Sequence, residues 1–277
     1  MKVRVTSITG YVDACMALKM SKRSLTQEYE DSLREAVDCL IMSNGAFITV
    51  PTEYKDLFNL LVTELDKVAK WGSGYGVDSY IDAGHETLLK FIDLSVHVKG
   101  LHRGAMDDFR THAYRMENRF VSSSTRHINA VDMDEMSDWY KDKILYSIPE
   151  KQLEGYVATP FGYVREGYEN DPDVLRGLYP LAIPTEFIFK VNLQQMRHIY
   201  MRRNTLTHAS PELGIMVEDI ADQVENMMGP TVLGKLIRYD YCSNGQLRHI
   251  MDIQKTYAPR FEDFGDQKNI NKTVIGE

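Results

Sequence analysis

Residues 110–127 concentrate guanidinium and hydroxyl groups, and these groups in combination are able to bind a phosphate. Guanidinium groups bind phosphate oxygens through paired hydrogen bonds, and neighbouring hydroxyls and loop N–H groups complete an anion cradle. The alternative is a basic loop that is simply solvated, and composition alone leaves both interpretations open. The basic and hydroxyl residues of this segment are Arg110, His112, Arg115, Arg119, Ser122, Ser123, Ser124, Thr125 and Arg126.

Arg176 is a second candidate for anion binding. It follows Leu175 and precedes Leu178, so its surroundings are mostly apolar. An arginine in such surroundings needs a carboxylate or an anionic ligand as its partner. By itself this residue does not decide between a structural ion pair and a ligand site.

A polar stripe follows the predicted helix over residues 191–203. Its positions recur near i, i+3, i+7 and i+11, which places them along one side of a helix. Such a stripe either lines a binding site or forms the solvated face of a surface helix. The residues in it are Asn192, Gln195, His198 or Arg202, and Arg203.

Metal and cysteine chemistry find little support in the sequence. Residues 84–87 (Gly-His-Glu-Thr) have the pattern of a glycine turn before a helix, and the His–Glu pair lacks a second ligand at helical spacing. Cys15, Cys39 and Cys242 are scattered and form no metal-binding or disulfide pattern. We therefore expect no metal site, and three packed or free thiols in a reducing cytoplasm.

Composition excludes several classes of protein. The 277 residues are 43% hydrophobic and 26% charged, which is typical of a soluble protein with a substantial core. The 32 basic and 40 acidic residues give a net charge of -8, so we expect no non-specific nucleic-acid binding. No apolar run approaches the roughly 18 residues of a membrane span, and no secretory signal is evident.

Periodicity predicts the elements that position these residues. Alternation predicts strands, while apolar residues at helical spacing predict amphipathic helices. Residues 110–127 are expected to be mostly loop. Strands are expected at residues 2–10, 46–50 and 94–98, and helices at 26–43, 52–71, 101–109, 191–203 and 211–228. Residues 187–191 are an apolar run that leads into the helix over 191–203.

The order of these features along the chain resembles the flavin-dependent thymidylate synthases. No single motif is decisive, but the motifs occur in the family's order from about residue 1 to 230. The matching segments are residues 17–21 (Ala-Leu-Lys-Met-Ser), 84–87, 109–112 (Phe-Arg-Thr-His), 124–127 (Ser-Thr-Arg-His), Arg176, 191–192, Arg203 and 208–213 (His-Ala-Ser-Pro-Glu-Leu).

The resemblance implies one α+β domain over residues 1–230, with a central, mostly antiparallel sheet and packed helices. Residues 46–80 would form an enlarged helical insertion. Residues 231–277 would be a C-terminal extension that ends in a polar tail. The family's composite active site also implies a homotetramer.

The resemblance further implies the activity. Such an enzyme transfers a methyl group to C5 of dUMP, with methylenetetrahydrofolate as the carbon donor, and makes dTMP. FAD carries the redox chemistry and NADPH supplies the reducing equivalents. The protein supplies position and charge, and no cysteine nucleophile is required.

Roles pass to this chain by matching position. Arg203 would lie beside the uracil and have the catalytic role, although a structural alternative pairs it with a carboxylate such as Glu212. The nucleotide would be held by Ser21, Ser124, Arg126, Arg176 and Arg203. The flavin would be lined by His85, Arg110, His112, Asn192 and His198.

The chain departs from the family pattern at several flavin positions. Thr111 stands in place of the histidine in the Arg-His-Arg motif, Gln194 in place of an arginine, and Asp107 in place of a glutamine. Two alternatives therefore remain open. One is a sister enzyme that alkylates or hydroxymethylates another pyrimidine nucleotide at C5. The other is a nucleotide-binding relative without flavin chemistry.

Overall fold

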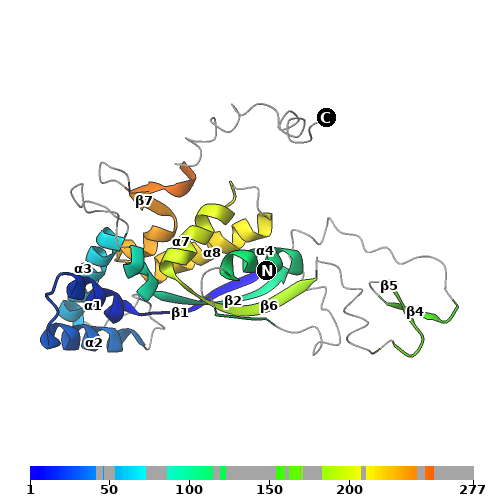
Figure 1. Ribbon diagram of the computed structural model, residues 1–277, viewed down its shortest axis with the longest axis horizontal. Coiled ribbons are helices and arrows are strands. Elements are labelled where there is room, and N and C mark those ends of the chain that lie inside the picture. Colours follow the sequence, from blue (N-terminus) through cyan, green and yellow to red (C-terminus); the bar gives the residue numbers. More distant parts are fainter. Residues whose placement is uncertain are drawn as a thin grey trace, which may run out of the picture.

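A four-stranded antiparallel sheet forms the centre of the computed structural model (Figure 1). Its order is β1-β2-β6-β3. The strands are β1 (Lys2–Thr9), β2 (Asp93–His102), β6 (Pro184–Asn192) and β3 (Arg119–Ser122). The structure describes residues 1–41, 46, 54–72, 86–114, 119–122, 154–159, 162–168, 170, 183–206, 210–241 and 247–252. The predicted α+β class with an antiparallel sheet is confirmed.

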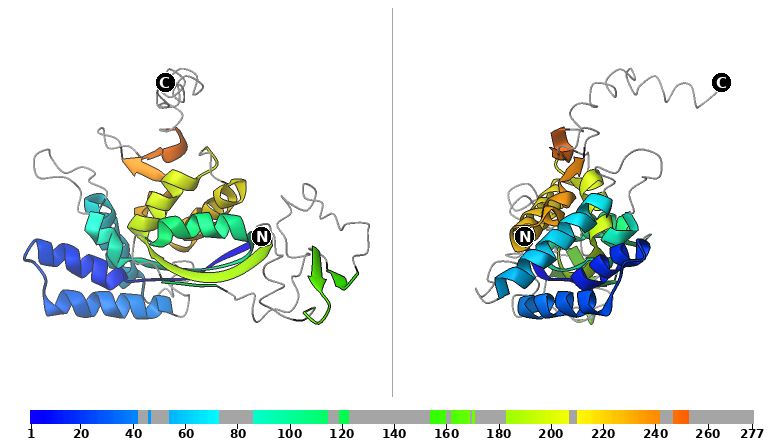
Figure 2. Two further views of the ribbon diagram at one scale, coloured as in Figure 1. Left: turned by 45° about the vertical axis from the view of Figure 1, so that its right-hand side comes forward. Right: turned by 90° about the vertical axis from the view of Figure 1, so that its left-hand side faces the viewer.

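Helices cover one face of this sheet and pack at one of its ends (Figures 1 and 2). Three helices lie over the face: α4 (Arg103–Tyr114), α7 (Leu193–Arg203) and α8 (Pro211–Met227). Three more pack against one another at the end: α1 (Tyr11–Ser21), α2 (Gln27–Ile41) and α3 (Lys55–Gly72). Within the described ranges, no helix combines the length and apolar character needed to cross a bilayer.

Short elements complete the described chain. Two 3-10 helices, η2 (Glu86–Phe91) and η4 (Val232–Ile237), pack against α7. Two hairpins are formed by β4 (Tyr156–Thr159) with β5 (Gly162–Arg165), and by β7 (Tyr239–Tyr241) with β8 (Leu247–His249).

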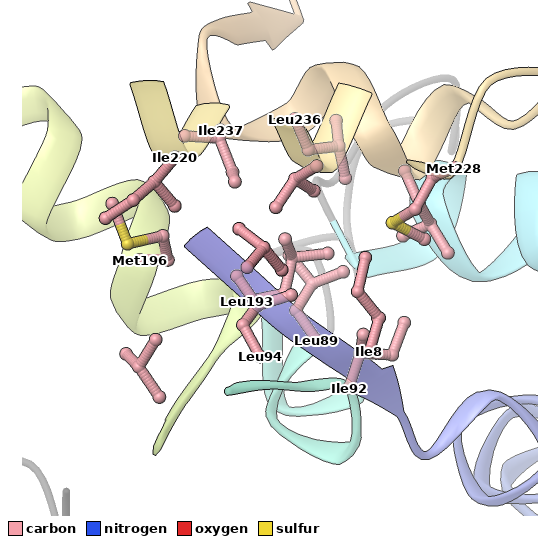
Figure 3. Packing of buried hydrophobic residues seen from close by; sticks show 14 of the residues in the cluster. Ile8, Leu89, Ile92, Leu94, Leu193, Met196, Ile220, Met228, Leu236 and Ile237 are labelled. Carbon is pink, nitrogen blue, oxygen red and sulfur yellow. The ribbon is translucent and has the colours of Figure 1, made fainter. Parts of the chain in front are cut away.

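Alternation along the strands builds the core between the sheet and its helices. Val96 of β2 and its register partner Phe189 of β6 are both buried. Phe109 of α4 packs on Phe187 and Phe189, with ring centroids 6.2 and 4.9 Å apart. Figure 3 shows the part of this core where η2, α7, α8 and η4 meet. The buried residues labelled there include Leu89, Leu193, Met196, Ile220, Leu236 and Ile237.

Helix α7 begins directly where strand β6 ends. Asn192 is the last residue of β6 and the N-cap of α7, and its Oδ1 accepts a hydrogen bond from Gln195 N at 2.9 Å. Leu193 N donates to Ile92 O at 2.8 Å, which ties the first turn of α7 to the end of η2. No loop separates strand from helix, so the register of β6 sets the position of every α7 side chain.

Helix α1 was not predicted from the sequence, and its local features explain why. Its N-cap is Gly10, which adopts a left-handed φ of 88° and offers no capping side chain. A Cβ at this position would come within 1.8 Å of Phe91 O, so only glycine fits. The helix buries one side, made of Tyr11, Val12, Ala14, Cys15 and Leu18, but its opposite side carries the apolar Met16, Ala17 and Met20, so the sequence shows little amphipathic contrast.

The expectation that residues 110–127 are mostly loop is wrong for the described part of this segment. Helix α4 continues to Tyr114, and β3 follows over Arg119–Ser122. Phe109 anchors the middle of α4 in the core, and the next residue, Arg110, is exposed. Strand β3 is short and pairs with β6 alone, so its alternation was too brief to predict a strand.

Other expectations have mixed outcomes. Helix α8 begins at Pro211 as predicted, but the side chain of its N-cap Ser210 makes no capping hydrogen bond. The expected strand over residues 46–50 and the tail beyond residue 252 lie outside the described residues, except for Ala46. In the C-terminal extension, η4 is held to α3 because Asp66 Oδ1 accepts from Val232 N at 2.7 Å.

Glu64 is the polar centre of the three-helix end. It is almost completely buried, and its oxygens accept from Tyr29 Oη at 2.7 Å and Lys67 Nζ at 2.5 Å, while Lys19 Nζ lies 3.7 Å away. Burial raises the pKa of this carboxyl, but the hydrogen bonds from Lys67 and Tyr29 outweigh burial and hold the pKa below its ordinary value. Glu64 thus joins all three helices through one charge.

We expect Glu64→Gln to lower the free energy of unfolding at pH 7 by about 1.5–3 kcal/mol, the range for hydrogen bonds to a charged group. The folded-state pKa lies below the unfolded value of about 4.3, so the contribution is complete above that pH and is lost as pH falls through the folded-state pKa. Urea unfolding of both proteins from about pH 3 to pH 7 measures this difference.

The control is Glu30→Gln, which breaks only the exposed 2.7 Å ion pair with Arg34. Exposed pairs contribute little, so its cost should stay below about 1 kcal/mol. A Glu64→Gln cost that equals the control, or that does not change with pH, would contradict the role assigned to Glu64.

Candidate functional site

Helix α7 carries three of the predicted site residues, and the structure describes all three. Asn192 caps its N-terminus, His198 lies half-buried in its middle and Arg203 is its last residue. Helical geometry places Asn192 and Arg203 about three turns apart on nearly the same side of the helix. His198 lies about 120° around the axis from Asn192, so it faces a different direction.

The Arg203 side chain is mostly buried and is fixed by an acidic residue of a neighbouring helix. Its Nη2 donates to Asp108 Oδ1 of α4 at 2.9 Å, and its Nη1 donates to Arg202 O at 3.3 Å. The side chain of Arg203 is 18% exposed and that of Asp108 is 40% exposed. The pair holds the guanidinium between α4 and α7 while its acidic partner remains open to solvent.

The suggested alternative of an Arg203–Glu212 pair is wrong about the partner. Glu212 is fully buried in the first turn of α8, and its Oε2 contacts Nδ1 of His102 and accepts from His102 N at 3.3 Å. A carboxylate in the first turn of a helix also interacts favourably with the helix dipole. Glu212 therefore joins the end of β2 to the start of α8, and Asp108 has the role beside Arg203.

Arg110 lies on α4 immediately after the buried Phe109. Its side chain is exposed, and its guanidinium carbon lies 5.3 Å from the centroid of the Phe120 ring of β3. A stacked, exposed guanidinium keeps its N–H donors available for a phosphate or a planar ligand. His112 belongs to α4 as well, but its side chain lies outside the described residues.

Of the remaining predicted site residues, the structure describes only Ser21. Ser21 is the last residue of α1, and its hydroxyl donates to Leu18 O at 2.7 Å. The structure therefore brings together Arg203 and Asp108, while Arg110 lies about 200° further around α4, over Phe120, and Ser21 lies on the separate three-helix end. His85, Ser124, Arg126 and Arg176 lie outside the described residues.

A flavin is the cofactor that the sequence predicts, and the described residues offer donors suited to it. The capping bond of Asn192 uses only its amide oxygen, so both N–H groups remain for a ligand. Arg110 adds an exposed guanidinium over an aromatic ring. These groups fit an anionic, ring-bearing cofactor. Gln194 supplies no charge where the resemblance expects an arginine, which weakens phosphate binding there.

Two polar residues of this region were not assigned a role from the sequence. Asp108 gave no signal, because its partner Arg203 is 95 residues away. Gln195 was part of the polar stripe, and its side chain is 2% exposed. Among the described residues, neither the amide nitrogen nor the amide oxygen of Gln195 has a hydrogen-bond partner. A buried amide of this kind needs a partner from a ligand or from another part of the chain.

A double-mutant cycle on Asp108→Asn and Arg203→Gln measures how strongly this pair braces the two helices. Because Asp108 is partly exposed, we expect a coupling free energy of about 0.3–1 kcal/mol in urea unfolding. The control cycle is Arg103→Gln with Asp107→Asn, whose longer 3.7 Å contact lies within α4. A coupling at Asp108 and Arg203 no larger than the control would show that the pair does not fix Arg203.

Comparison with known proteins gives a family match and similar solved structures. A family model described as thymidylate synthase complementing protein matches residues 63–229. A flavin dependent thymidylate synthase from Helicobacter pylori, solved with FAD and dUMP, is 13% identical over 80% of this chain and 93% of that chain, with a TM-score of 0.45. A UMP/dUMP methylase from Streptomyces cacaoi, bound with 5-Br UMP, is 10% identical over 85% and 92%, with a TM-score of 0.41. No curated protein sequence matches the chain.

Proposed function

The chain belongs to the thymidylate synthase complementing protein family, and we propose that it is a flavin-dependent enzyme that methylates C5 of a uracil nucleotide. The substrate we propose is dUMP, the carbon donor methylenetetrahydrofolate, the reductant NADPH and the product dTMP. The observation that carries the proposal is Arg203, a mostly buried cation held by Asp108 on the same side of α7 as Asn192.

Arg203 is suited to stabilise negative charge on the pyrimidine. As C5 becomes nucleophilic, negative charge grows on the neighbouring carbonyl oxygen of the uracil ring. A fixed cation stabilises this charge more in the transition state than in the bound nucleotide, and only such a difference raises the rate. Asp108 limits the movement of the guanidinium, so little reorganisation is needed during the reaction.

The remaining roles follow the positions of the family's motifs. We propose that Ser124, Arg126 and Arg176 bind the nucleotide phosphate, with Ser21 nearby. When bound, the flavin supplies the redox chemistry and the folate supplies the carbon. The flavin would be held by His85, Arg110, His112, Asn192 and His198, across subunits of a homotetramer.

The described cysteine is consistent with a reaction that uses no thiol nucleophile. Cys15 is fully buried in α1, and burial followed by the nearby Glu64 charge raises the pKa of its thiol. A thiol with a raised pKa is a poor nucleophile at neutral pH. The polarisation of the pyrimidine therefore falls to charged groups such as Arg203 in this proposal.

Product mass from a panel of nucleotides tests the proposed reaction. The protein is supplied with FAD, NADPH, methylenetetrahydrofolate and one of dUMP, UMP, dCMP or CMP. We expect dUMP to gain the mass of a methyl group in place of hydrogen. A hydroxymethyl product, or a preference for another nucleotide, would instead identify a sister enzyme. No product from any nucleotide in the presence of bound flavin would contradict enzyme function.

Arg203→Lys tests the electrostatic role. Lysine keeps the charge but loses the planar guanidinium held by Asp108, so we expect turnover to fall by about 10²-fold with a smaller change in nucleotide affinity. The control is Arg202→Lys, the exposed residue immediately before it. Turnover, nucleotide binding and melting temperature are measured on the same preparation. A lower melting temperature with normal turnover would show that Arg203 stabilises the fold and has no catalytic role.

Arg126→Ala and Arg176→Ala test phosphate recognition. Each substitution removes charge-assisted hydrogen bonds, so dUMP affinity in calorimetry should fall by about 1.5–3 kcal/mol. Arg165→Ala, on the exposed side of β5, is the matched control and should leave the affinity unchanged. Unchanged affinity in both test variants would remove these two arginines from the nucleotide site.

A further inference from the structure

Four lysines lie together where α1 and α3 meet, away from the residues on α7. They are Lys19, Lys22, Lys67 and Lys70, and we refer to them as the lysine cluster. The buried carboxylate of Glu64 organises the inner pair: Lys67 Nζ lies 2.5 Å from Oε1 and Lys19 Nζ lies 3.7 Å from Oε2. Glu64 carries one negative charge, which cannot neutralise both Lys19 and Lys67.

Aromatic rings hold two of these ammonium groups in place. Lys22 Nζ lies 4.1 Å from the ring centroid of Trp71 at the end of α3, and Lys19 Nζ lies 4.5 Å from that of Tyr29 on α2. Cation–π contacts at these distances orient a lysine but leave the N–H donors on the far side of the ring free to bind an anion. The arrangement is therefore partly organised before any ligand arrives.

The structure also shows the electrostatic cost of gathering these charges. Burial lowers the pKa of Lys22, and the charges of Lys19 and Lys67 lower it further. Arg23 follows directly with a φ of 53°, a left-handed conformation that is uncommon for a residue other than glycine. This conformation is the ordinary end of helix α1, closed by Ser24 N donating to Lys19 O at 3.0 Å, so the gathered cations alone are what favours a bound anion here.

We propose that the lysine cluster binds an anion that carries two or more phosphate groups. Packed helices lie about 8–10 Å apart, and Lys67 and Lys70 are separated by nearly one helical turn, so the charges extend beyond the reach of a single phosphate. Lysine binds phosphate as a point charge, in contrast to the paired hydrogen bonds of arginine. The ligand is either a free oligophosphate or the diphosphate of a dinucleotide. The lysine cluster shares no residue with the proposed nucleotide site, although Lys22 directly follows Ser21 of that site.

Trp71 provides a direct reporter of binding. Inorganic pyrophosphate is titrated into the full-length protein carrying Trp139→Phe, which leaves Trp71 as the only tryptophan of the chain. Because Lys22 lies over the Trp71 ring, neutralising or moving that ammonium group should change the tryptophan emission. We expect a saturable change at pyrophosphate concentrations below about 1 mM, which weakens as added salt shortens the screening length.

Charge variants locate the site. Lys22→Gln and Lys70→Gln should each weaken pyrophosphate binding, measured by calorimetry, by at least about threefold. Lys55→Gln removes the same charge from the other end of α3, about 20 Å from Lys70, and should have no effect beyond weak screening. Arg126→Ala should also leave pyrophosphate binding intact, so failure of the proposed nucleotide site would not affect this result.

Binding of different ligands distinguishes the two possible sources of the phosphate groups. Tighter binding of FAD or NADPH than of pyrophosphate, lost in Lys22→Gln, would identify a dinucleotide. Tighter binding of tripolyphosphate than of either dinucleotide would identify a free oligophosphate. Equal binding of citrate would overturn the preference for phosphate. No saturable signal, or equal weakening by Lys55→Gln, would overturn the site itself.

Discussion

Strand β6 turns into helix α7 without an intervening loop, and β2 holds that strand in place along its whole length. The register runs from the pair Asp93–Asn192 at one end to His102–Pro184 at the other. Because Asn192 both ends the strand and caps the helix, a shift of one residue in this pairing would rotate α7 relative to the core. Arg203 would then no longer meet Asp108. The position of the candidate site is thus a consequence of strand pairing.

Charged groups then join the surrounding elements to this frame. Glu212 links α8 to the end of β2 through His102, and Gln223 of α8 bonds to Val5 N at 2.8 Å and Val3 O at 2.9 Å along the edge of β1. Arg238, which follows η4, donates to Glu218 Oε2 at 3.1 Å, and Glu218 accepts from Tyr200 of α7 at 2.8 Å. The start of the C-terminal extension is therefore part of the support for α7.

Much of this frame follows from sequence pattern. Alternation predicted β1 and β2, and helical spacing predicted α2, α3, α7 and α8, because these elements each bury one side. For β6 the sequence showed only an apolar run before α7. Helix α1 escaped prediction because a glycine in a left-handed conformation replaces the usual cap, and because apolar residues on its open side hide the amphipathic pattern. Strand β3 escaped because an edge strand of this length carries too little alternation.

Helical spacing grouped the polar residues of α7 in advance, but it could not predict their contacts. The polar stripe on α7 singled out Asn192, Gln195 and Arg203 as one group, since helical spacing alone determines which residues share a side. The partner of Arg203 depends on the crossing of α4 and α7, which no local pattern encodes. The sequence therefore suggested Glu212 as the partner of Arg203, whereas the tertiary structure places Asp108 beside it. Long-range ion pairs of this kind are set by tertiary structure.

The central claim is that this protein activates C5 of a uracil nucleotide, and the loss of an isotope from that carbon tests it most directly. dUMP carrying deuterium at C5 is incubated with the wild-type protein and reduced FAD, and the nucleotide is followed by mass spectrometry. We predict release of the deuterium to solvent or its loss on methylation when folate is added, in either case dependent on the protein. Binding of dUMP and FAD with complete retention of deuterium under both conditions would contradict the account.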